Sequence, residues 1–207
     1  MKYRKYTSIL SLAALLWAAP ARGADRCDCD SEVHDKIDSY DALLNLSPSK
    51  IASARSKHAL WGLPAAPASA THEHLLAQKD YLIWYDDDLR VPLWVSYRLT
   101  KSNLKTHRER LECFRRDPRL DQSVAGMCDD YDEPTFDRGH LVPNADMERT
   151  EAAMLNTYLF SNMTPQFSNF NRGVWEKLES MVRDWARVKG AIYVISGSIF
   201  CSPACLK

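Results

Sequence analysis

The 207-residue sequence lacks an excess of either charge, because 27 Lys and Arg residues stand against 27 Asp and Glu residues. Proteins that bind nucleic acid without sequence preference through their overall charge are usually basic. The balanced composition excludes that mode of binding. Any surface of this chain that binds a polyanion therefore has to be local.

Long hydrophobic runs are also missing, apart from one near the start. Residues 9–19 are apolar except for Ser11, and this run is far shorter than the ~20 residues that cross a bilayer. Basic residues precede the run, and Ala21-Arg22-Gly23 follows it with small-x-small spacing, which is the pattern of a secretory signal peptide. We expect residues 1–23 to be removed, the remaining chain to be mildly acidic, and the protein to be secreted, or periplasmic or otherwise extracytoplasmic, with no membrane attachment.

No two cysteines have the CxxC spacing that is typical of zinc sites. An even number of cysteines in an exported chain favours disulfide bonds instead. Six cysteines allow 15 pairings, and a bond between Cys113 and Cys128 is the most economical local choice. The six are Cys27, Cys29, Cys113, Cys128, Cys201 and Cys205.

The chain divides by composition near residue 80. Residues 24–79 carry no repeat and no catalytic pattern, so they are expected to form an N-terminal arm, with a short helix within residues 35–46. His58, His72 and His74 in this arm are expected at the surface, since an isolated His-x-His pair is a weak metal signal. Residues 80–207 are predicted to form the main domain.

Aromatic and branched residues dominate the start of this domain, at residues 81–85 and 91–99. Asp86-Asp87-Asp88 interrupts the run, and a solvated turn explains this triplet better than a metal site. The pattern predicts an antiparallel hairpin.

Residues 98–119 are locally basic, with eight basic residues against three acidic ones. Such a run is either an ordinary solvated face or the place where a polyanion backbone docks, and the sequence does not decide between them.

The clearest predicted helix covers residues 174–188, where apolar residues recur with a period of 3.6. Lys189-Gly190 provides its stop, and a strand of the buried type is expected at residues 191–195. A short helix is predicted at residues 151–156, and residues 157–162 are apolar enough for a strand or a buried turn. The helical repeat consists of Val174, Trp175, Leu178, Met181, Val182, Trp185 and Val188.

The residues best suited to chemistry begin with Asp137-Arg138-Gly139-His140. A histidine that titrates near neutrality can take a proton from water, and an arginine can bridge phosphate oxygens. Asn171 offers an amide oxygen of the kind that Mg²⁺ prefers, and Glu179 follows two helical turns later. Taken singly, each feature has a simpler explanation. The four-residue motif could be a turn with an ion pair, Asn171 a helix N-cap, and Glu179 an ordinary exposed helix glutamate.

Two blocks together closely resemble the signature of the DNA/RNA non-specific endonucleases, the family of endonuclease G and secreted bacterial sugar-non-specific nucleases. The first block is residues 136–147, and the second comprises residues 158–166 and 170–179. The resemblance implies an α+β fold, mixed in character, with a central antiparallel sheet and a ββα-metal (His-Me finger) active site.

The same resemblance implies a role for each matching residue. His140 would be the general base, Asn171 the sole protein ligand of Mg²⁺, and Glu179 would hold the water ligands of the ion. Arg138 would contact phosphate, and Asn162 would help to shape the site. Mn²⁺ or another divalent cation can substitute for Mg²⁺ in such a site.

Family members carry a further phosphate-binding arginine upstream of this block. Arg110, Arg115 and Arg116 all lie in the matching region, and we prefer Arg115. Members also continue beyond the strand at residues 191–200, whereas this sequence stops at Lys207, so we expect a reduced or truncated C-terminal part.

The sequence therefore predicts an exported Mg²⁺-dependent endonuclease that cleaves DNA and RNA with little sequence preference and leaves 5′-phosphate ends. The alternative is a catalytically inactive family member that binds nucleic acid or another polyanion through residues 98–119. The oligomeric state cannot be read from the sequence.

Overall fold

The computed structural model describes residues 26–64 and 72–199. The predicted signal peptide, Cys201 and Cys205 lie outside the described residues. The helices are α1 (His34–Ala42), α2 (Pro48–His58), α3 (Glu151–Leu155), a π-helical segment (Phe170–Trp175) and α4 (Glu176–Lys189). The strands are β1 (Arg26–Cys27), β2 (Glu73–Ala77), β3 (Leu82–Asp86), β4 (Val91–Thr100), β5 (Phe114–Arg115), β6 (Phe136–His140), β7 (Met163–Phe167) and β8 (Ala191–Gly197).

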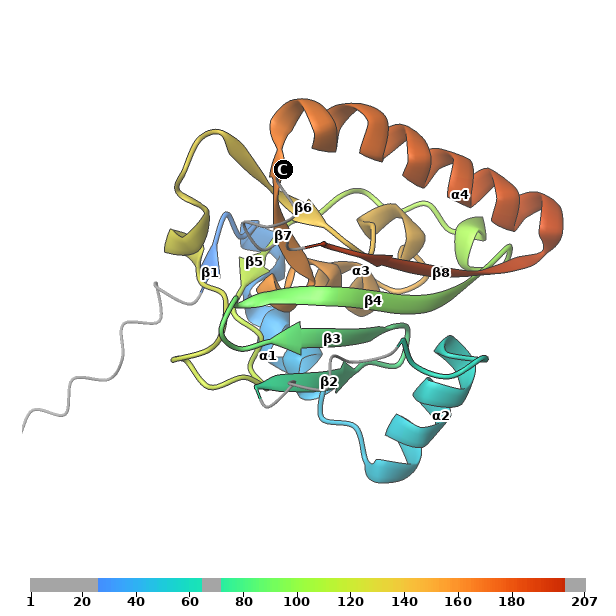
Figure 1. Ribbon diagram of the computed structural model, residues 1–207, viewed down its shortest axis with the longest axis horizontal. Coiled ribbons are helices and arrows are strands. Elements are labelled where there is room, and N and C mark those ends of the chain that lie inside the picture. Colours follow the sequence, from blue (N-terminus) through green and yellow to red (C-terminus); the bar gives the residue numbers. More distant parts are fainter. Residues whose placement is uncertain (1–25, 65–71, 200–207) are drawn as a thin grey trace, which may run out of the picture.

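The central sheet is antiparallel, with strand order β2-β3-β4-β8 (Figure 1). The predicted hairpin is confirmed, since β3 pairs with β4 and the residues between them form the turn. The side chain of Asp86 closes this turn by accepting a hydrogen bond of 2.8 Å from the main-chain nitrogen of Leu89. The predicted α+β class with a central antiparallel sheet is confirmed.

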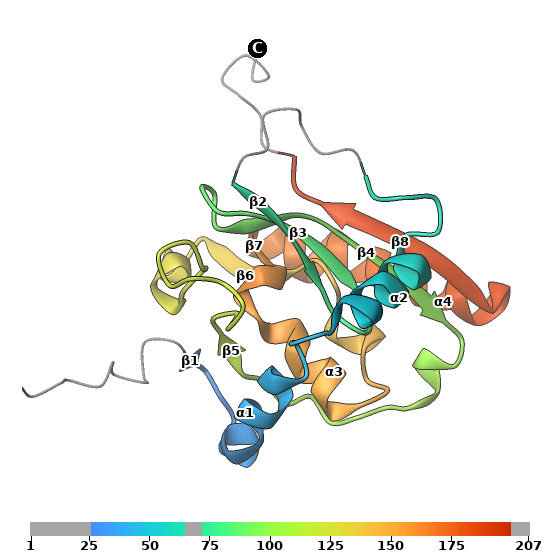
Figure 2. The same cartoon turned by 90° about the horizontal axis from the view of Figure 1, so that it is seen from below.

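The two faces of the sheet are covered by different helices, because side chains alternate along a strand. Leu82 and Trp94 pack with Ala54 of α2 on one face. Ile83 and Val95 belong to the core on the other face, which includes Ala186 of α4. Figures 1 and 2 show α2 and α4 on opposite sides of the sheet. Both α2 and β2 fall within the range predicted as an arm.

His58 corrects one expectation, because it is buried and not at the surface. Its Nε2 lies 2.9 Å from the carbonyl oxygen of Lys79, and its Nδ1 accepts a hydrogen bond of 3.1 Å from the main-chain nitrogen of Arg98. Burial lowers the pKa of this ring to about 4, so it is neutral and ties α2 to the sheet. His72 and His74 are exposed, as expected.

A second core joins α1 to the region around the disulfides. Ile37 of α1 and Val33, which immediately precedes α1, pack there with Tyr158 and Phe160. The cysteines pair as Cys27–Cys128 and Cys29–Cys113, so the expected bond between Cys113 and Cys128 is wrong. The reason is long-range, since β1 pairs with β5 and places the N-terminal cysteines beside the two later ones.

The second half of the chain follows the predicted elements with two differences. The helix at residues 174–188 is confirmed as α4, but the turns before it are π-helical. The strand β8 is confirmed, yet in the described part of the chain it is a half-exposed edge and not a buried strand. Residues 157–162 form buried 3₁₀ turns, in agreement with the turn alternative. No helix within the described ranges is long and apolar enough to cross a membrane.

Candidate active site

Strands β6 and β7 and the helical segment that follows them bring the two motif blocks together. β6 and β7 pair antiparallel, with Gly139 opposite Thr164 and His140 opposite Met163. A Cβ atom at Gly139 would lie 2.2 Å from Cδ of the Gln166 side chain, which fills this space and would have to move for any larger residue. The chain then runs from β7 directly through the π-helical segment into α4, and the result is a ββα unit.

His140 ends β6 and is packed against aromatic rings. The edge-on ring of Tyr158 lies 4.9 Å from it and the ring of Phe114 lies 6.2 Å away, between centroids. Trp175 donates a hydrogen bond of 3.2 Å to the carbonyl oxygen of His140, which fixes the helical segment to the strand. Among the described residues, the buried Nε2 of His140 has no hydrogen-bond partner.

Burial, assisted by the positive charge of Arg110, lowers the pKa of His140 to about 3. The ring is therefore neutral near pH 7, and one of its nitrogens carries a lone pair. An unpaired polar atom in a buried ring is unusual in a core and typical of a functional group.

Arg138 packs against the same aromatic ring. Its guanidinium carbon is 4.9 Å from the centroid of Phe114, and it forms an ion pair with Asp28. Arg138 and His140 are two residues apart in β6, so their side chains leave the strand on the same face.

Asn171 lies in the π-helical segment, and its side chain is held by Asp137. The amide nitrogen Nδ2 of Asn171 donates a hydrogen bond of 3.0 Å to Asp137. Arg172 and Ser168 bind the same carboxylate, and the hydrogen bonds from Arg172 and Asn171, in that order, lower the pKa of Asp137 to about 2. Because the nitrogen of the Asn171 amide is used in this way, its oxygen is directed elsewhere and remains the donor atom for a ligand.

Glu179 is half-buried on α4 and lines a cavity of about 330 Å³ together with Leu141 and Trp175. Burial and the neighbouring charge of Asp146 raise the pKa of Glu179 to about 7. Asp146 itself accepts a hydrogen bond of 2.7 Å from Tyr97 and pairs with Arg183. Glu179 is therefore a half-buried carboxyl group with a raised pKa and not an ordinary exposed helix glutamate.

The residues present fit a divalent cation that is held mainly through water. In residues 26–64 and 72–199, no group of three or more His, Cys, Asp or Glu side chains could hold a metal ion. A site with one protein ligand would need the amide oxygen of Asn171 and an acidic group for the water shell, and the half-buried Glu179 is such a group. Oxygen donors of this kind suit Mg²⁺, which keeps several of its waters.

Asn162 is fully buried and clamps the loop that follows His140. Its side-chain oxygen accepts a hydrogen bond of 3.0 Å from the main-chain nitrogen of Val142. Its side-chain nitrogen donates hydrogen bonds of 3.0 Å to the carbonyl oxygen of Val142 and 2.9 Å to that of Thr157. Asn162 therefore holds the backbone that follows His140, and its role in shaping the site stays a prediction.

Replacing Asn162 by alanine should lower the free energy of unfolding by about 2–4 kcal/mol, because it leaves three buried backbone groups without partners. Urea denaturation measures this loss. The exposed Asn169 is the matched control, and its alanine variant should stay within about 0.5 kcal/mol of the original. An Asn162→Ala protein as stable as the control would contradict the clamp.

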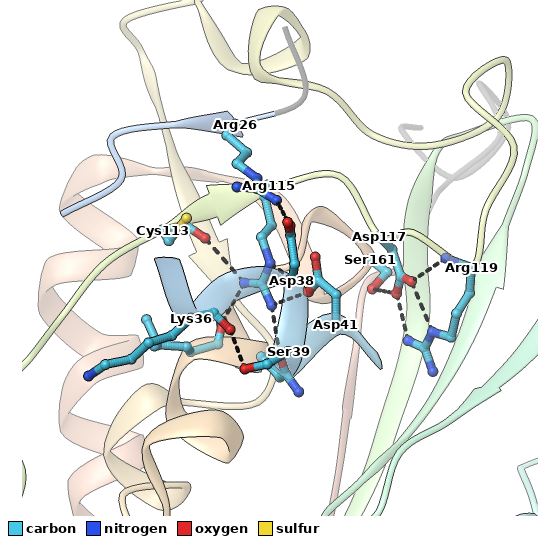
Figure 3. Close-up of polar contacts among 12 residues, drawn as sticks. Arg26, Lys36, Asp38, Ser39, Asp41, Cys113, Arg115, Asp117, Arg119 and Ser161 are labelled. Atoms are coloured by element: carbon cyan, nitrogen blue, oxygen red, sulfur yellow. Dashed lines mark hydrogen bonds and ion pairs between the residues drawn. The ribbon is translucent and has the colours of Figure 1, made fainter. Parts of the chain in front are cut away.

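The structure does not place Arg115 where it could contact a phosphate, and this preference was wrong. Arg115 is 1% exposed, and its guanidinium is bound to Asp41 and to the carbonyl oxygens of Cys113 and Leu155 (Figure 3). A charged group that is buried and paired on all sides holds α1 against the core. The sequence could not reveal this, since Asp41 is 74 residues away.

The two other candidate arginines differ in position. Arg116 is half-buried and donates a hydrogen bond of 2.9 Å to the carbonyl oxygen of Leu120. Arg110 is exposed, lies with its guanidinium carbon 5.9 Å from the ring centroid of Tyr158, and is close enough to lower the pKa of His140. Of the three, Arg110 is the one that the geometry brings to the site.

The basic run at residues 98–119 does not form a continuous track. Besides Arg115, Arg119 is 12% exposed and pairs with the fully buried Asp117 (Figure 3). Arg108 is half-buried and donates a hydrogen bond of 2.9 Å to the carbonyl oxygen of Glu148. Several basic residues of this run therefore form ion pairs and hydrogen bonds within the protein and are not displayed on the surface.

The chain shows clear similarity to known proteins. A model of the family described as DNA/RNA non-specific endonuclease matches residues 66–203. Nuclease C1 of Cunninghamella echinulata var. echinulata is 34% identical over 135 residues, which cover 63% of this chain and 53% of that protein. Mitochondrial endonuclease G of Homo sapiens is 32% identical over 143 residues, which cover 69% of this chain and 46% of that one.

The fold of this chain is also similar to that of a solved structure. A crystal structure of the EndoG/EndoGI complex contains a chain that matches with a TM-score of 0.64 and 27% sequence identity, and the match covers 76% of this chain and 62% of that one. This chain spans about half the length of the curated relatives described above.

Proposed function

Because the chain belongs to the DNA/RNA non-specific endonuclease family, we propose that it is an exported, Mg²⁺-dependent hydrolase of phosphodiester bonds in DNA and RNA. The single observation that carries the proposal is the neutral His140 with an unpaired Nε2, placed at the end of β6 beside the half-buried Arg138. The other two motif residues, Asn171 and Glu179, lie on the π-helical segment and on α4 of the same ββα unit. Export is supported by the predicted leader and by the two disulfides, which persist in oxidising compartments.

In the proposed reaction, the ring nitrogen of His140 that bears the lone pair takes the proton from the attacking water. Arg138 and Arg110 bind the phosphate oxygens and orient the scissile bond. Asn171 and Glu179 would hold Mg²⁺, and the bound ion would neutralise charge on the phosphate and stabilise the leaving alkoxide. The proposed products carry 5′-phosphate ends.

The alternative of an inactive polyanion binder has less support. It relies on residues 98–119, where Arg115 and Arg119 are largely buried in ion pairs. It also leaves the unpaired Nε2 of His140 without a purpose.

Purified protein should degrade both supercoiled plasmid and a structured RNA in Mg²⁺, and EDTA should stop both reactions. Gel analysis of the fragments, followed by end labelling with and without phosphatase, tests for the 5′-phosphate. The absence of any Mg²⁺-dependent cleavage would exclude the proposal, and salt-sensitive binding without cleavage would support the alternative.

The affinity for Mg²⁺ should increase by about tenfold between pH 6 and pH 8, because Glu179 has to lose its proton to hold the water shell. The pKa of Glu179 is raised to about 7, so the carboxyl is protonated below that pH and ionised above it. By the same linkage, the free energy of unfolding without metal falls as the pH rises from the ordinary glutamate range through 7.

Isothermal titration with Mg²⁺ across this pH range measures the effect. Glu179→Gln should bind more weakly and lose the pH dependence. Glu176→Gln, which changes an exposed residue one turn earlier on α4, is the control and should keep it. A Glu179→Gln protein with the original pH profile would rule out this role.

A further inference from the structure

Two disulfides hold the segment Cys27-Asp28-Cys29, which we name the N-terminal strap, against the candidate active site. Cys27 is bonded to Cys128 and Cys29 to Cys113, across 101 and 84 residues. Just after the strap, the main-chain nitrogen of Asp30 donates a hydrogen bond of 2.9 Å to the carbonyl oxygen of Glu112. The strap is therefore fixed at both ends.

The backbone of Asp28 adopts an unusual conformation within the strap. Its φ angle is +48°, and among the non-glycine residues in the described part of the chain only Arg90 shares a positive φ. L-residues rarely adopt this left-handed region, and such a conformation persists only when the surrounding structure imposes it. Here the flanking disulfides impose it.

This conformation presents the carboxylate of Asp28 to Arg138. The two side chains form an ion pair, in which Asp28 is 64% exposed and Arg138 is 21% exposed. The guanidinium carbon of Arg138 also lies 4.9 Å from the centroid of the Phe114 ring, so the group is in contact with both an aromatic ring and a carboxylate. The arginine that the proposed function assigns to phosphate is thus already occupied by an anion.

We propose that Asp28 is an internal competitor for the substrate phosphate and sets the affinity of the site for nucleic acid. A carboxylate and a phosphate bind the planar fork of arginine through the same kind of charge-assisted hydrogen bonds. A nucleic-acid strand has to displace Asp28 from Arg138, and its remaining phosphates offset this cost by contacting Arg110. The inference rests on the proposed function.

Asp28→Asn tests this competition without adding strain, because asparagine tolerates a positive φ at least as well as aspartate. In EDTA, the variant should bind a fluorescently labelled 20-base-pair DNA duplex about threefold to fivefold more tightly than the original protein at low salt, as expected for loss of an exposed ion pair. The difference should shrink at high salt. In Mg²⁺, KM should fall by a similar factor while kcat stays unchanged.

Asp35→Asn is the matched control, since it removes one exposed carboxylate from α1, close to the strap in sequence. It should change the affinity far less than Asp28→Asn. A Cys27→Ser/Cys128→Ser protein that retains the other disulfide should approach the affinity of Asp28→Asn, and adding Asp28→Asn to it should bring little further gain. If this double variant does not fold, the comparison of Asp28→Asn with Asp35→Asn still tests the inference.

Equal affinity of Asp28→Asn and the control, or weaker binding by Asp28→Asn, would overturn the inference. Tighter binding in EDTA by a protein that never cleaves in Mg²⁺ would support the competition and reject the hydrolase. If Asp28→Asn cleaves DNA with an unchanged KM, the competition by Asp28 is rejected and the proposed hydrolase function stands.

Discussion

Replacement of His140 by alanine should lower kcat on plasmid DNA by about 10²- to 10⁴-fold, the range that a positioned general base contributes. The reason is that the two rings packed against His140 cannot take the proton in its place. His140 lies at the end of β6, and its Nε2 is buried and has no hydrogen-bond partner among the described residues. Of the two rings beside it, Tyr158 has a pKa raised to about 12 and Phe114 is apolar, so neither accepts a proton near neutral pH. Affinity for DNA in EDTA should change little, since the neutral ring offers no charge to a phosphate.

Without substrate, the pKa of His140 lies below the near-neutral range that was expected from the sequence and that suits a general base best. Burial and Arg110 keep the free ring neutral, with a pKa of about 3. Arg110 already forms an ion pair of 2.6 Å with Glu112, so the change that a bound phosphate would bring is a further negative charge near the ring, which raises the pKa of His140. The base thus becomes stronger when substrate is present, which favours proton transfer at the moment of reaction.

Initial rates of plasmid relaxation at saturating Mg²⁺ measure the loss. His72→Ala is the control, because His72 is exposed and pairs with Asp88 at the sheet edge. It should retain full activity. Partial recovery of His140→Ala by added imidazole would identify a missing base, whereas full activity of His140→Ala without imidazole would reject the mechanism.

Local signals in the sequence predicted much of the fold and most of the site. The periodic apolar residues of α4 and the aspartate-interrupted hairpin are short-range patterns, and such patterns survive folding unchanged. The motif residues His140, Arg138 and Asn171 lie on β6 and on the π-helical segment of one ββα unit, and their roles in catalysis stay a prediction. Asp137, which orients Asn171, was inside the motif but was given no role, since its partner is 34 residues away.

Long-range pairing explains what the sequence could not predict. The disulfides follow from the pairing of β1 with β5, and burial of Arg115 depends on Asp41 of α1. His58 is buried because Lys79 and Arg98 complete its hydrogen bonds. In each case the partner lies more than 20 residues away, and composition alone carries no sign of it.

Replacement of Asn171 by alanine should weaken Mg²⁺ binding by about 100-fold or more, since even the partners of a metal ligand contribute about 10- to 100-fold. Asn171 is the only protein ligand that we propose for the ion, and its amide oxygen is set by the hydrogen bond from Nδ2 to Asp137. The rate in 1 mM Mg²⁺ should fall in proportion. A higher concentration of Mg²⁺ should restore part of it.

Aspartate at this position should not be a conservative substitute, although it keeps an oxygen ligand. Asn171→Asp removes the Nδ2 donor that lies 3.0 Å from Asp137 and places two carboxylates against each other. The pKa of Asp137 is about 2, so it remains ionised near neutral pH and repels the new group. We expect Asn171→Asp to bind Mg²⁺ more weakly than the original protein and to lose thermal stability, which Asn171→Ala should largely keep.

Titration calorimetry with Mg²⁺, thermal melting and cleavage rates against Mg²⁺ concentration distinguish these outcomes. Asn169→Ala is the control, since Asn169 is exposed and immediately precedes the π-helical segment. It should match the original protein in all three measurements. If Asn171→Ala retained the original Mg²⁺ affinity, the ion would have to be held elsewhere, and the orienting contact with Asp137 would have no catalytic meaning.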